Sequence, residues 1–469
     1  MPLRLLFNHE HTGLEPNSYA ADSSAATVIL KLCCPSLVRL DRDMVLRPDL
    51  ATDWSVEDDA RRFTFALRRD VAMQGGRPLD ADLVAWNFRR LFDPRVNTLL
   101  RADYAGLEEV TAIDRHTVRF RFGESFPAFP HHLAWRTYVT DDRLTQPVGA
   151  GPYAVTAWHR GSHVTLRRVP DHPDAGSYAF DELEIRWAPT AEARLAVIRA
   201  GGADIVETVP ATAAAELARE GLLDSVAVTT PRKVVIAFNL GEPPFDDPRM
   251  RRAVAHAVDR DGLRAAFFAG RARAVNGVLP ADDPWSVPLD PVPHDPTEAR
   301  RLVEASGHGA GVTVKVAATA VMPMPRVVAR VAAELAVVGI HLDVRCYDDP
   351  PWWPAVYLEG HWQMAFQGAS ARPHPDILFG RDLVTGGSYN PLHYSSPPLD
   401  ALVAEARRTT GEDRQRALYA EAQRVIHADL PILPLWSADV LAGWNPRLRG
   451  FRPHPLGYIE LAGVTMEAG

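Results

Sequence analysis

The sequence predicts an α/β protein built from more than one domain. Its 469 residues exceed the length that a single hydrophobic core usually supports. Strand patterns dominate the first third of the chain, whereas helical and strand patterns alternate in the second half. Hydrophobic residues make up 46% of the chain and charged residues 23%, which is typical of a folded globular protein.

The first part of the chain alternates apolar and polar residues as β-strands do. Segments 1–7, 61–68, 117–122 and 163–169 have this pattern. In the second of them Phe63, Phe65 and Leu67 share one face. One helix is expected between these strands, following Asp80 and ending at Asp93-Pro94.

Helices in the later part of the chain have recognisable start signals. Thr190 precedes one that ends at Gly201-Gly202, and Asp247-Pro248 precedes one that runs through Ala257. Asp295 begins another, in which Glu298 would complete a capping box. Further helices are expected at 327–338 and 398–426, and strands at 234–239, 312–317 and 341–346.

Charge and cysteine content exclude several classes of protein. The net charge of −8 predicts no basic face for a nucleic acid. Only three of the 51 basic residues are lysines, namely Lys31, Lys233 and Lys315. Three cysteines are too few for a disulfide framework, so adjacent Cys33 and Cys34 are interpreted as reduced structural thiols.

Targeting and membrane signals are the next feature. The first residues have only a short apolar stretch before Asn8 and lack the pattern of a secretory signal, which predicts a cytoplasmic protein, or an extracytoplasmic one if the sequence is a trimmed mature form. No window reaches the roughly 18 apolar residues of a membrane-spanning helix, so membrane insertion is not expected.

Common catalytic signatures are absent from the sequence. There is no Gly-x-Ser-x-Gly, no phosphate loop ending in Gly-Lys-Ser/Thr, no His-Glu-x-x-His and no Cys-x-x-Cys pair. Gly149-Ala150-Gly151 leads through Pro152 into a strand rather than opening a helix, unlike a dinucleotide turn. We therefore predict no catalytic residues and no cofactor.

A few polar and aromatic residues remain as candidates for binding. His9-Glu10-His11 has metal-ligating side chains, but this spacing is common by chance and we predict no metal site. His374 lies in a polar loop. Trp352 and Trp353 lie in a proline-broken segment, and either core packing or a ligand wall would explain them.

Six segments together resemble the family 5 extracellular solute-binding proteins, which serve peptide, nickel and related ABC importers. They extend over nearly the whole chain. The segments are 48–54 (PDLATDW), 63–68 (FTFALR), 78–84 (PLDADLV), 149–153 (GAGPY), 237–253 (AFNLGEPPFDDPRMRRA) and 430–436 (LPILPLW).

The resemblance implies a two-lobed periplasmic-binding-protein-like (Venus flytrap) fold with an extra small domain in the first lobe. Lobe I would comprise residues 1–35, 146–239 and 438–469, the inserted α+β domain 36–145, and lobe II 240–437. Such a protein captures its ligand between the lobes by hinge closure and needs no covalent chemistry.

One departure from the family pattern bears on the ligand. Peptide-binding members have Trp-x-x-Asp before Pro-Asp-Pro-Asp, and the Asp holds the peptide's α-ammonium. Aligning 373–376 with that tail places Gly368 at the Trp and Ala371 at the Asp. Without the carboxylate, peptides with a free N-terminus should be poor ligands. Arg372 could instead pair with a carboxylate or phosphate.

The resemblance also suggests which residues bind the ligand. The expected set is His9, Glu10, His11, Asn239, Trp352, Trp353, Gln367, Gly368, Ala369, Ser370, Ala371, Arg372, His374, Tyr389 and Asn390.

Two hypotheses for the function follow. The first is a monomeric, non-enzymatic binder of a small molecule or a modified or peptide-like ligand, working with ABC permease subunits if it is exported. The alternative is a cytoplasmic protein that reuses the fold as a biosynthetic enzyme, tailoring factor or ligand sensor. In that case His9, Glu10, His11 and His374 would be the candidates for proton transfer.

Overall fold

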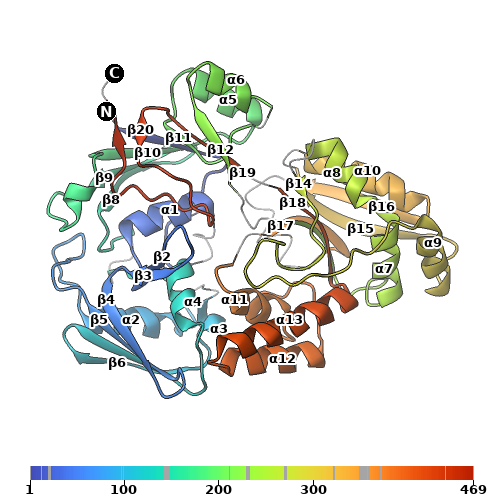
Figure 1. Ribbon diagram of the computed structural model, residues 1–469, viewed down its shortest axis with the longest axis horizontal. Coiled ribbons are helices and arrows are strands. Elements are labelled where there is room, and N and C mark those ends of the chain that lie inside the picture. Colours follow the sequence, from blue (N-terminus) through green and yellow to red (C-terminus); the bar gives the residue numbers. More distant parts are fainter. Residues whose placement is uncertain are drawn as a thin grey trace. The chain divides into compact units, whose positions relative to one another are not determined.

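A computed structural model describes most of the chain. The described residues are 2–11, 13–18, 23–96, 98, 100–141, 147–210, 212–228, 233–268, 272–320, 323–347, 356, 360–369, 372–438 and 440–467. The chain forms two compact units (Figure 1). Unit 1 consists of residues 1–229 and 440–469, and unit 2 of residues 230–439. The sequence placed the first boundary after Asn239. In the structure it precedes the strand Lys233–Phe238, because this strand pairs with strands of unit 2.

Unit 1 is built around a seven-stranded sheet. Its order is β12-β19-β11-β1-β10-β9-β8, and β1 runs parallel to both of its neighbours. The strands are β1 (Leu3–Phe7), β8 (Tyr153–His159), β9 (His163–Arg168), β10 (Glu182–Trp187), β11 (Ile205–Val206), β12 (Asp224–Val228) and β19 (Val440–Trp444). Helices α1 (Ser24–Cys33), α5 (Ala191–Arg199) and α6 (Ala214–Arg219) belong to the same unit, as does the 3-10 turn Ala175–Ser177. The late strand β19 lies inside this sheet, so the unit needs both ends of the chain.

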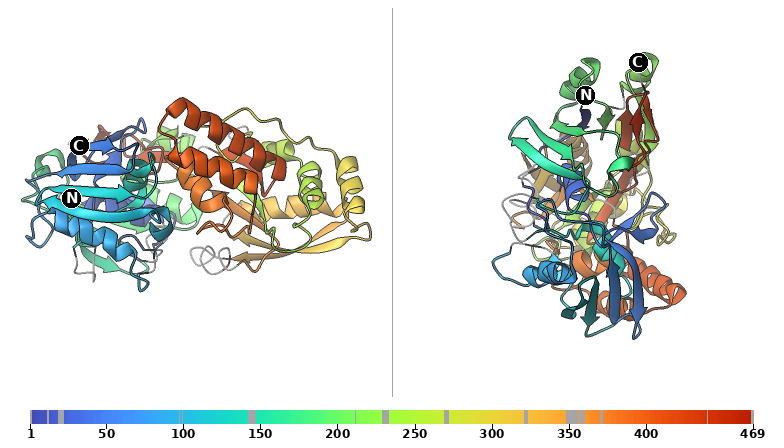
Figure 2. Two further views of the ribbon diagram at one scale, coloured as in Figure 1. Left: turned by 90° about the horizontal axis from the view of Figure 1, so that it is seen from below. Right: turned by 90° about the vertical axis from the view of Figure 1, so that its left-hand side faces the viewer.

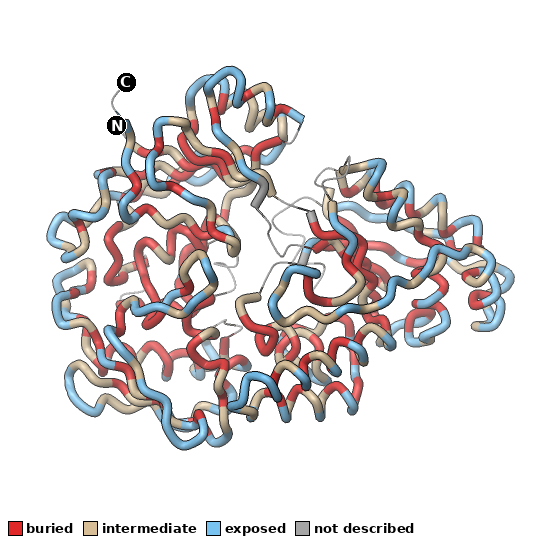
Figure 3. The backbone as a smooth tube through the Cα atoms, in the orientation of Figure 1, coloured by how far each residue is buried: buried red, intermediate tan, exposed pale blue. Residues whose placement is uncertain are grey.

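A second sheet in unit 1 has its own aromatic core. The strands follow the order β4-β5-β7-β6, with bounds β4 (Ala51–Glu57), β5 (Arg62–Leu67), β6 (Leu107–Asp114) and β7 (Thr117–Phe122). Helices α2 (Ala81–Leu91), α3 (Leu100–Asp103) and α4 (Phe129–Arg136) and the hairpin β2 (Val38–Leu40) and β3 (Leu46–Pro48) accompany it. Phe88 packs edge-on against Phe120 and Phe129 packs edge-on against Phe122, with ring centroids 4.7 and 4.8 Å apart. Buried residues alternate with less buried ones along β5 and β7, whereas β4 and β6 are mostly exposed or half-buried (Figure 3).

Unit 2 contains a six-stranded sheet with a core on each face. Its order is β14-β18-β13-β17-β15-β16. The strands are β13 (Lys233–Phe238), β14 (Ala272–Arg273), β15 (Val312–Thr319), β16 (Ile340–Tyr347), β17 (Met364–Ala369) and β18 (Ile432–Ala438). Ile236 and Phe238 face one core, and Ala237, on the opposite side of β13, faces the other.

Helices cover both faces of this sheet. One core takes residues from α7 (Pro248–Ala257), α8 (Arg260–Phe268), α9 (Pro296–Ala305) and α10 (Met324–Ala336). The other takes residues from the π-helical turn η4 (Phe379–Leu383), α12 (Pro397–Arg408) and α13 (Glu412–Asp429), and the short α11 (Pro375–Leu378) lies beside η4. Figure 2 shows α12 and α13 lying side by side.

The expected helix starts are confirmed, with one correction. Side-chain oxygens of Asp80, Thr190, Asp247 and Asp295 accept hydrogen bonds from backbone N–H groups of the first turn. The capping box expected at Glu298 does not form. The Asp295 N–H donates instead to the His256 carbonyl at 2.8 Å, and Glu298 pairs with Arg301.

Two other expectations about helices were wrong. The segment 398–426 is two helices, because Thr409 adopts an extended conformation and ends α12. The sequence predicted a single helix among the early strands, which is α2, and missed helices α1, α3 and α4. Nearly every residue of α1 is buried, so it lacks the one-sided apolar pattern that reveals an amphipathic helix.

The Gly149-Ala150-Gly151 motif is a packing device. The Gly151 N–H donates to the Cys33 carbonyl at 3.0 Å, at the end of α1. A Cβ on Gly151 would lie 2.2 Å from the Leu32 carbonyl oxygen, and one on Gly149 would lie 2.2 Å from that of Cys33. Strand β8 begins at Tyr153, as expected. The glycines are therefore required so that the backbone can pass α1 closely.

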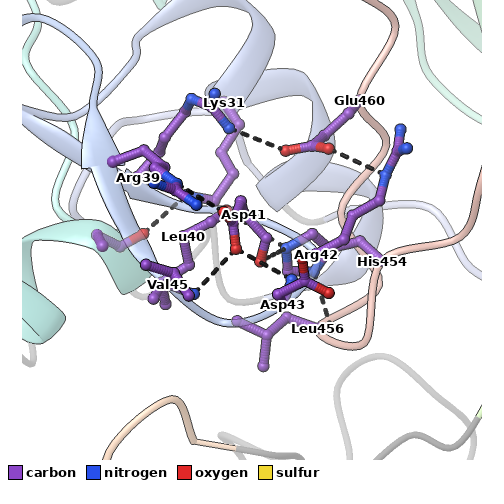
Figure 4. Close-up of polar contacts among 12 residues, drawn as sticks. Lys31, Arg39, Leu40, Asp41, Arg42, Asp43, Val45, His454, Leu456 and Glu460 are labelled. Carbon is purple, nitrogen blue, oxygen red and sulfur yellow. Dashed lines mark hydrogen bonds and ion pairs between the residues drawn. The ribbon is translucent and has the colours of Figure 1, made fainter.

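The C-terminal segment of unit 1 is fastened to the β2–β3 hairpin (Figure 4). Glu460 accepts ion pairs from Arg39 at 3.3 Å and from Arg42 at 3.1 Å. His454 donates from Nε2 to the Asp41 carbonyl at 3.0 Å, and its Nδ1 accepts from the Leu456 N–H at 3.0 Å. These contacts hold residues beyond β19 against a hairpin near the start of the chain.

Cysteines and membrane propensity complete the description. Cys33 and Cys34 are buried free thiols, and Cys346 is an exposed one. Across the described ranges, no helix has the length and apolar character required to cross a membrane.

Candidate functional site

In unit 1 the loop after β1 brings Glu10 to the β8–β9 hairpin. The Glu10 carboxylate accepts hydrogen bonds from Trp158 Nε1 at 3.2 Å and from the Gly161 N–H at 3.0 Å. Glu10 therefore fixes the loop to the hairpin tip. Its role in ligand binding stays a prediction.

His11 lies beside two tryptophans. Its side chain is 2% exposed, and its ring centroid is 4.4 Å from that of Trp158 and 6.1 Å from that of Trp187. Burial lowers the pKa of His11 to about 4, so the imidazole is neutral at pH 7. Apart from the backbone of Gly13, no described residue offers its nitrogens a hydrogen bond. A neutral, buried ring of this kind can hydrogen-bond a ligand but is a poor proton donor.

The His9-Glu10-His11 segment shows no converging set of metal ligands. Among the described residues, no group of three or more His, Cys, Asp or Glu side chains could hold a metal ion. Glu10 and His11 instead contact the neighbouring hairpin and its tryptophan.

In unit 2 three adjacent strand ends place polar residues together. Lys233 begins β13 and pairs with Ala369 of β17 and Ser437 of β18. Gln367, two residues before Ala369 in β17, lies on the same face of the sheet as Lys233. The exposed fractions of Lys233, Ser437 and Gln367 are 4%, 6% and 7%. Sequence reasoning missed Lys233, and its only signal was a rare lysine at the start of an apolar strand.

Charged groups of the 372–389 segment lie around one carboxylate. Asp382 is paired with Arg372 at 3.3 Å and with Arg381 at 2.6 Å. The Arg381 guanidinium lies 4.6 Å from the centre of the Tyr389 ring, in cation–π contact. The structure thus connects two of the expected residues, Arg372 and Tyr389, through Arg381 and Asp382.

The lysine and this arginine cluster interact electrostatically. Burial lowers the pKa of Lys233 to about 7, with Asp283 and Asp382 opposing the shift and Arg372 adding to it. Burial also raises the pKa of Asp283.

Three other expected residues hydrogen-bond to the backbone of their own unit. The Asn239 amide nitrogen donates to the carbonyls of Gly360 and Trp362, and the Asn390 amide nitrogen to those of Val384 and Tyr394. His374 Nδ1 accepts from the Asp376 N–H and so caps α11. These contacts give each residue a structural task, and binding by them stays a prediction.

The remaining expected residues lie on β17 or outside the described part of the chain. Among the described residues, a Cβ added to Gly368 would have only the Lys233 carbonyl oxygen within reach, at 4.0 Å. Ala369 ends β17. Trp352, Trp353, Ser370 and Ala371 fall outside the described residues.

Comparison with known proteins identifies the class of protein. The family model of the bacterial extracellular solute-binding proteins, family 5 (Middle), matches residues 45–390, and the chain belongs to this family. This confirms both the resemblance and the non-enzymatic solute-binding role expected from it.

Individual relatives agree with this assignment. The glutathione-binding protein GsiB of Salmonella choleraesuis is 28% identical over 465 residues, which cover 94% of this chain and 90% of the relative. A dipeptide-binding protein from Pseudoalteromonas, solved with Met-Leu, has a TM-score of 0.91 at 22% identity, with 100% of both chains covered. The A. tumefaciens protein AgaA, solved with agropinic acid, has a TM-score of 0.91 at 20% identity, covering 100% of this chain and 99% of that one. These likenesses confirm the expected fold.

Proposed function

We propose that this chain is the solute-binding component of an ABC importer and captures a small, peptide-like solute outside the cytoplasm. Membership of the family supports the role, and relatives named for glutathione or solved with Met-Leu support the class of solute. The proposed partners are the permease subunits of the importer, and the proposed state of the free protein is a monomer.

The observation that carries the proposed ligand class is Gly368 on β17. The resemblance places a tryptophan at this position and an aspartate at Ala371, and this chain has neither. No atom of the described residues would lie closer than 4.0 Å to a Cβ at Gly368. A solute whose amino end is blocked or modified loses nothing here, since no aspartate is present at Ala371 to hold an α-ammonium.

The ligand class is tested by comparing two forms of one peptide. We expect isothermal titration calorimetry to show that N-acetyl-Met-Leu binds at least as tightly as Met-Leu, because acetylation removes an ammonium that no aspartate at position 371 compensates. Loss of binding on acetylation would contradict the proposal, as would failure of both peptides and of glutathione to bind.

A variant of the protein also tests the proposed ligand class. Ala371→Asp restores the carboxylate, and we expect it to favour Met-Leu over N-acetyl-Met-Leu about tenfold or more, by the usual strength of a hydrogen bond to a charged group. Ala371→Asn is the matched control, since it adds a similar volume without charge.

The compartment is tested by fractionating the native host. We expect an antibody to find the protein in the extracytoplasmic fraction. Recovery in the cytosolic fraction alone would contradict the role in import.

A further inference from the structure

Lys233 lies where three strands of unit 2 end together. Its side chain is on the same face of β13 as those of Val235 and Ala237. On the neighbouring strands Lys233 pairs with Ala369 of β17 and Ser437 of β18. Farther along that face the paired residues are Ala237 and Ala365, which belong to the apolar core. The face therefore changes from apolar to polar toward its end, and the ammonium lies at the polar end.

Among the described residues, the ammonium of Lys233 has no direct partner. It forms no hydrogen bond and no ion pair with any of them, although the residue is only 4% exposed. Its charged neighbours are Asp283, Asp382 and Arg372. Asp382 is already paired with two arginines, and Asp283 accepts the Trp285 N–H at 2.9 Å. A buried ammonium without a contacting anion is unfavourable, and an anion brought in from outside would relieve this cost.

The local charge balance favours such an anion. The cluster contains the cations Lys233, Arg372 and Arg381 and the carboxylates Asp283 and Asp382. With all five ionised, one positive charge is in excess. Because an ammonium only donates hydrogen bonds, its natural partner is a group that only accepts them, such as a carboxylate.

We propose that Lys233 is a carboxylate-binding residue of unit 2, whose ammonium binds a carboxylate group of the captured solute. This inference deepens the proposed function and rests on it, because it names the part of the peptide-like solute that unit 2 recognises. The low pKa of Lys233, about 7, agrees with an ammonium that lacks its counter-ion in the free protein.

Affinity measurements with paired peptides test the proposal. N-acetyl-Met-Leu and its C-terminal amide differ in the carboxylate alone. We expect amidation to weaken binding to the unaltered protein about tenfold or more, the usual effect of losing a charge-assisted hydrogen bond. In Lys233→Met, which keeps the apolar stem, we expect the two peptides to bind equally. Lys315→Met is the matched control, since Lys315 is exposed on β15 of the same unit and should leave the tenfold preference intact.

A second measurement reports on Lys233 directly. The chain has three lysines, so ¹³Cε-labelled lysine gives three signals that Lys→Met variants assign. We expect N-acetyl-Met-Leu to raise the titration midpoint of the Lys233 signal and the amide to leave it unchanged. A structural lysine would show no such difference.

The two proposals fail in different ways. If no peptide binds but acetate shifts the Lys233 titration upward, the peptide-like ligand class is wrong and the carboxylate site stands. If the peptides bind and amidation affects neither affinity nor the Lys233 signal, the carboxylate site is wrong and the proposed function stands. If neither acetate nor any peptide moves the Lys233 signal, the carboxylate site is overturned.

Discussion

His454 is a buried imidazole that uses both of its nitrogens. Nε2 donates to a carbonyl of the β2–β3 segment, and Nδ1 accepts from the Leu456 N–H. Burial is the main reason that the pKa of His454 falls to about 4 from its ordinary value near 6.5. A proton on Nδ1 would break the bond from Leu456 and place a charge among buried groups.

This arrangement predicts a loss of stability in acid. Between pH 6.5 and 4 the unfolded chain binds a proton at His454 that the folded chain does not, so the free energy of unfolding falls as pH falls through this window. The full contribution is present above pH 6.5 and amounts to at most about 3 kcal/mol. We expect urea unfolding at pH 7 and pH 4.5 to show a smaller decrease in His454→Gln than in the unaltered protein.

The comparison isolates His454 because other buried histidines are common to both proteins. Burial also lowers the pKa of His11 and His131 to about 4, and their contributions cancel in the difference. An identical decrease in the two proteins would contradict the prediction.

At the scale of single elements, the sequence predicted the features that depend on residues close together in the chain, such as helix caps. Asp80 and Asp247 cap α2 and α7 as expected, because a cap bonds to the N–H groups of the next turn. The reciprocal bond at Glu298 could not be predicted, since the Asp295 N–H is taken by His256 of a different helix. The fully buried helix α1 likewise has no one-sided pattern to detect.

The close approach of the Gly149–Gly151 backbone to α1 gives a prediction for one glycine. We expect Gly151→Ala to lower the free energy of unfolding by about 2 to 3 kcal/mol, because the new methyl group would overlap the Leu32 carbonyl oxygen and force the backbone apart. Urea unfolding measures the change. Gly176→Ala is the control, since its Cβ would meet no atom of the described residues within 4 Å. Equal stabilities of the two variants would contradict this account of the motif.

At the scale of the whole molecule, the sequence predicted the class of fold but only part of the candidate site. The family motifs are largely structural, as Asp247 and Gly151 show, and they therefore reveal the fold. Lys233 could not be singled out, because its surroundings depend on pairing β13 with β17 and β18, strands far away in the chain. The departure at Gly368 was visible only because the motif around it could be aligned.

The position of β19 predicts how the molecule responds to truncation. A chain ending at residue 439 lacks β19, the strand that pairs with both β11 and β12. We expect hydrogen exchange to show loss of protection in β11 and β12, whereas β13, β15 and β17 of unit 2 keep theirs. A chain ending at residue 464 loses only β21 (Thr465–Met466), the edge partner of β20 (Leu448–Arg449), and should keep protection in β11 and β12. Unchanged protection in the shorter chain would contradict the prediction.

The same strand sets an order of events during synthesis. A ribosome makes β1 before the strands of unit 2 and β19 after them, yet β1 and β19 belong to one sheet. Unit 2 is continuous from residue 230 to residue 439, so all its strands have been made before β19 is. We therefore expect unit 1 to complete its fold after unit 2, once β19 has been translated.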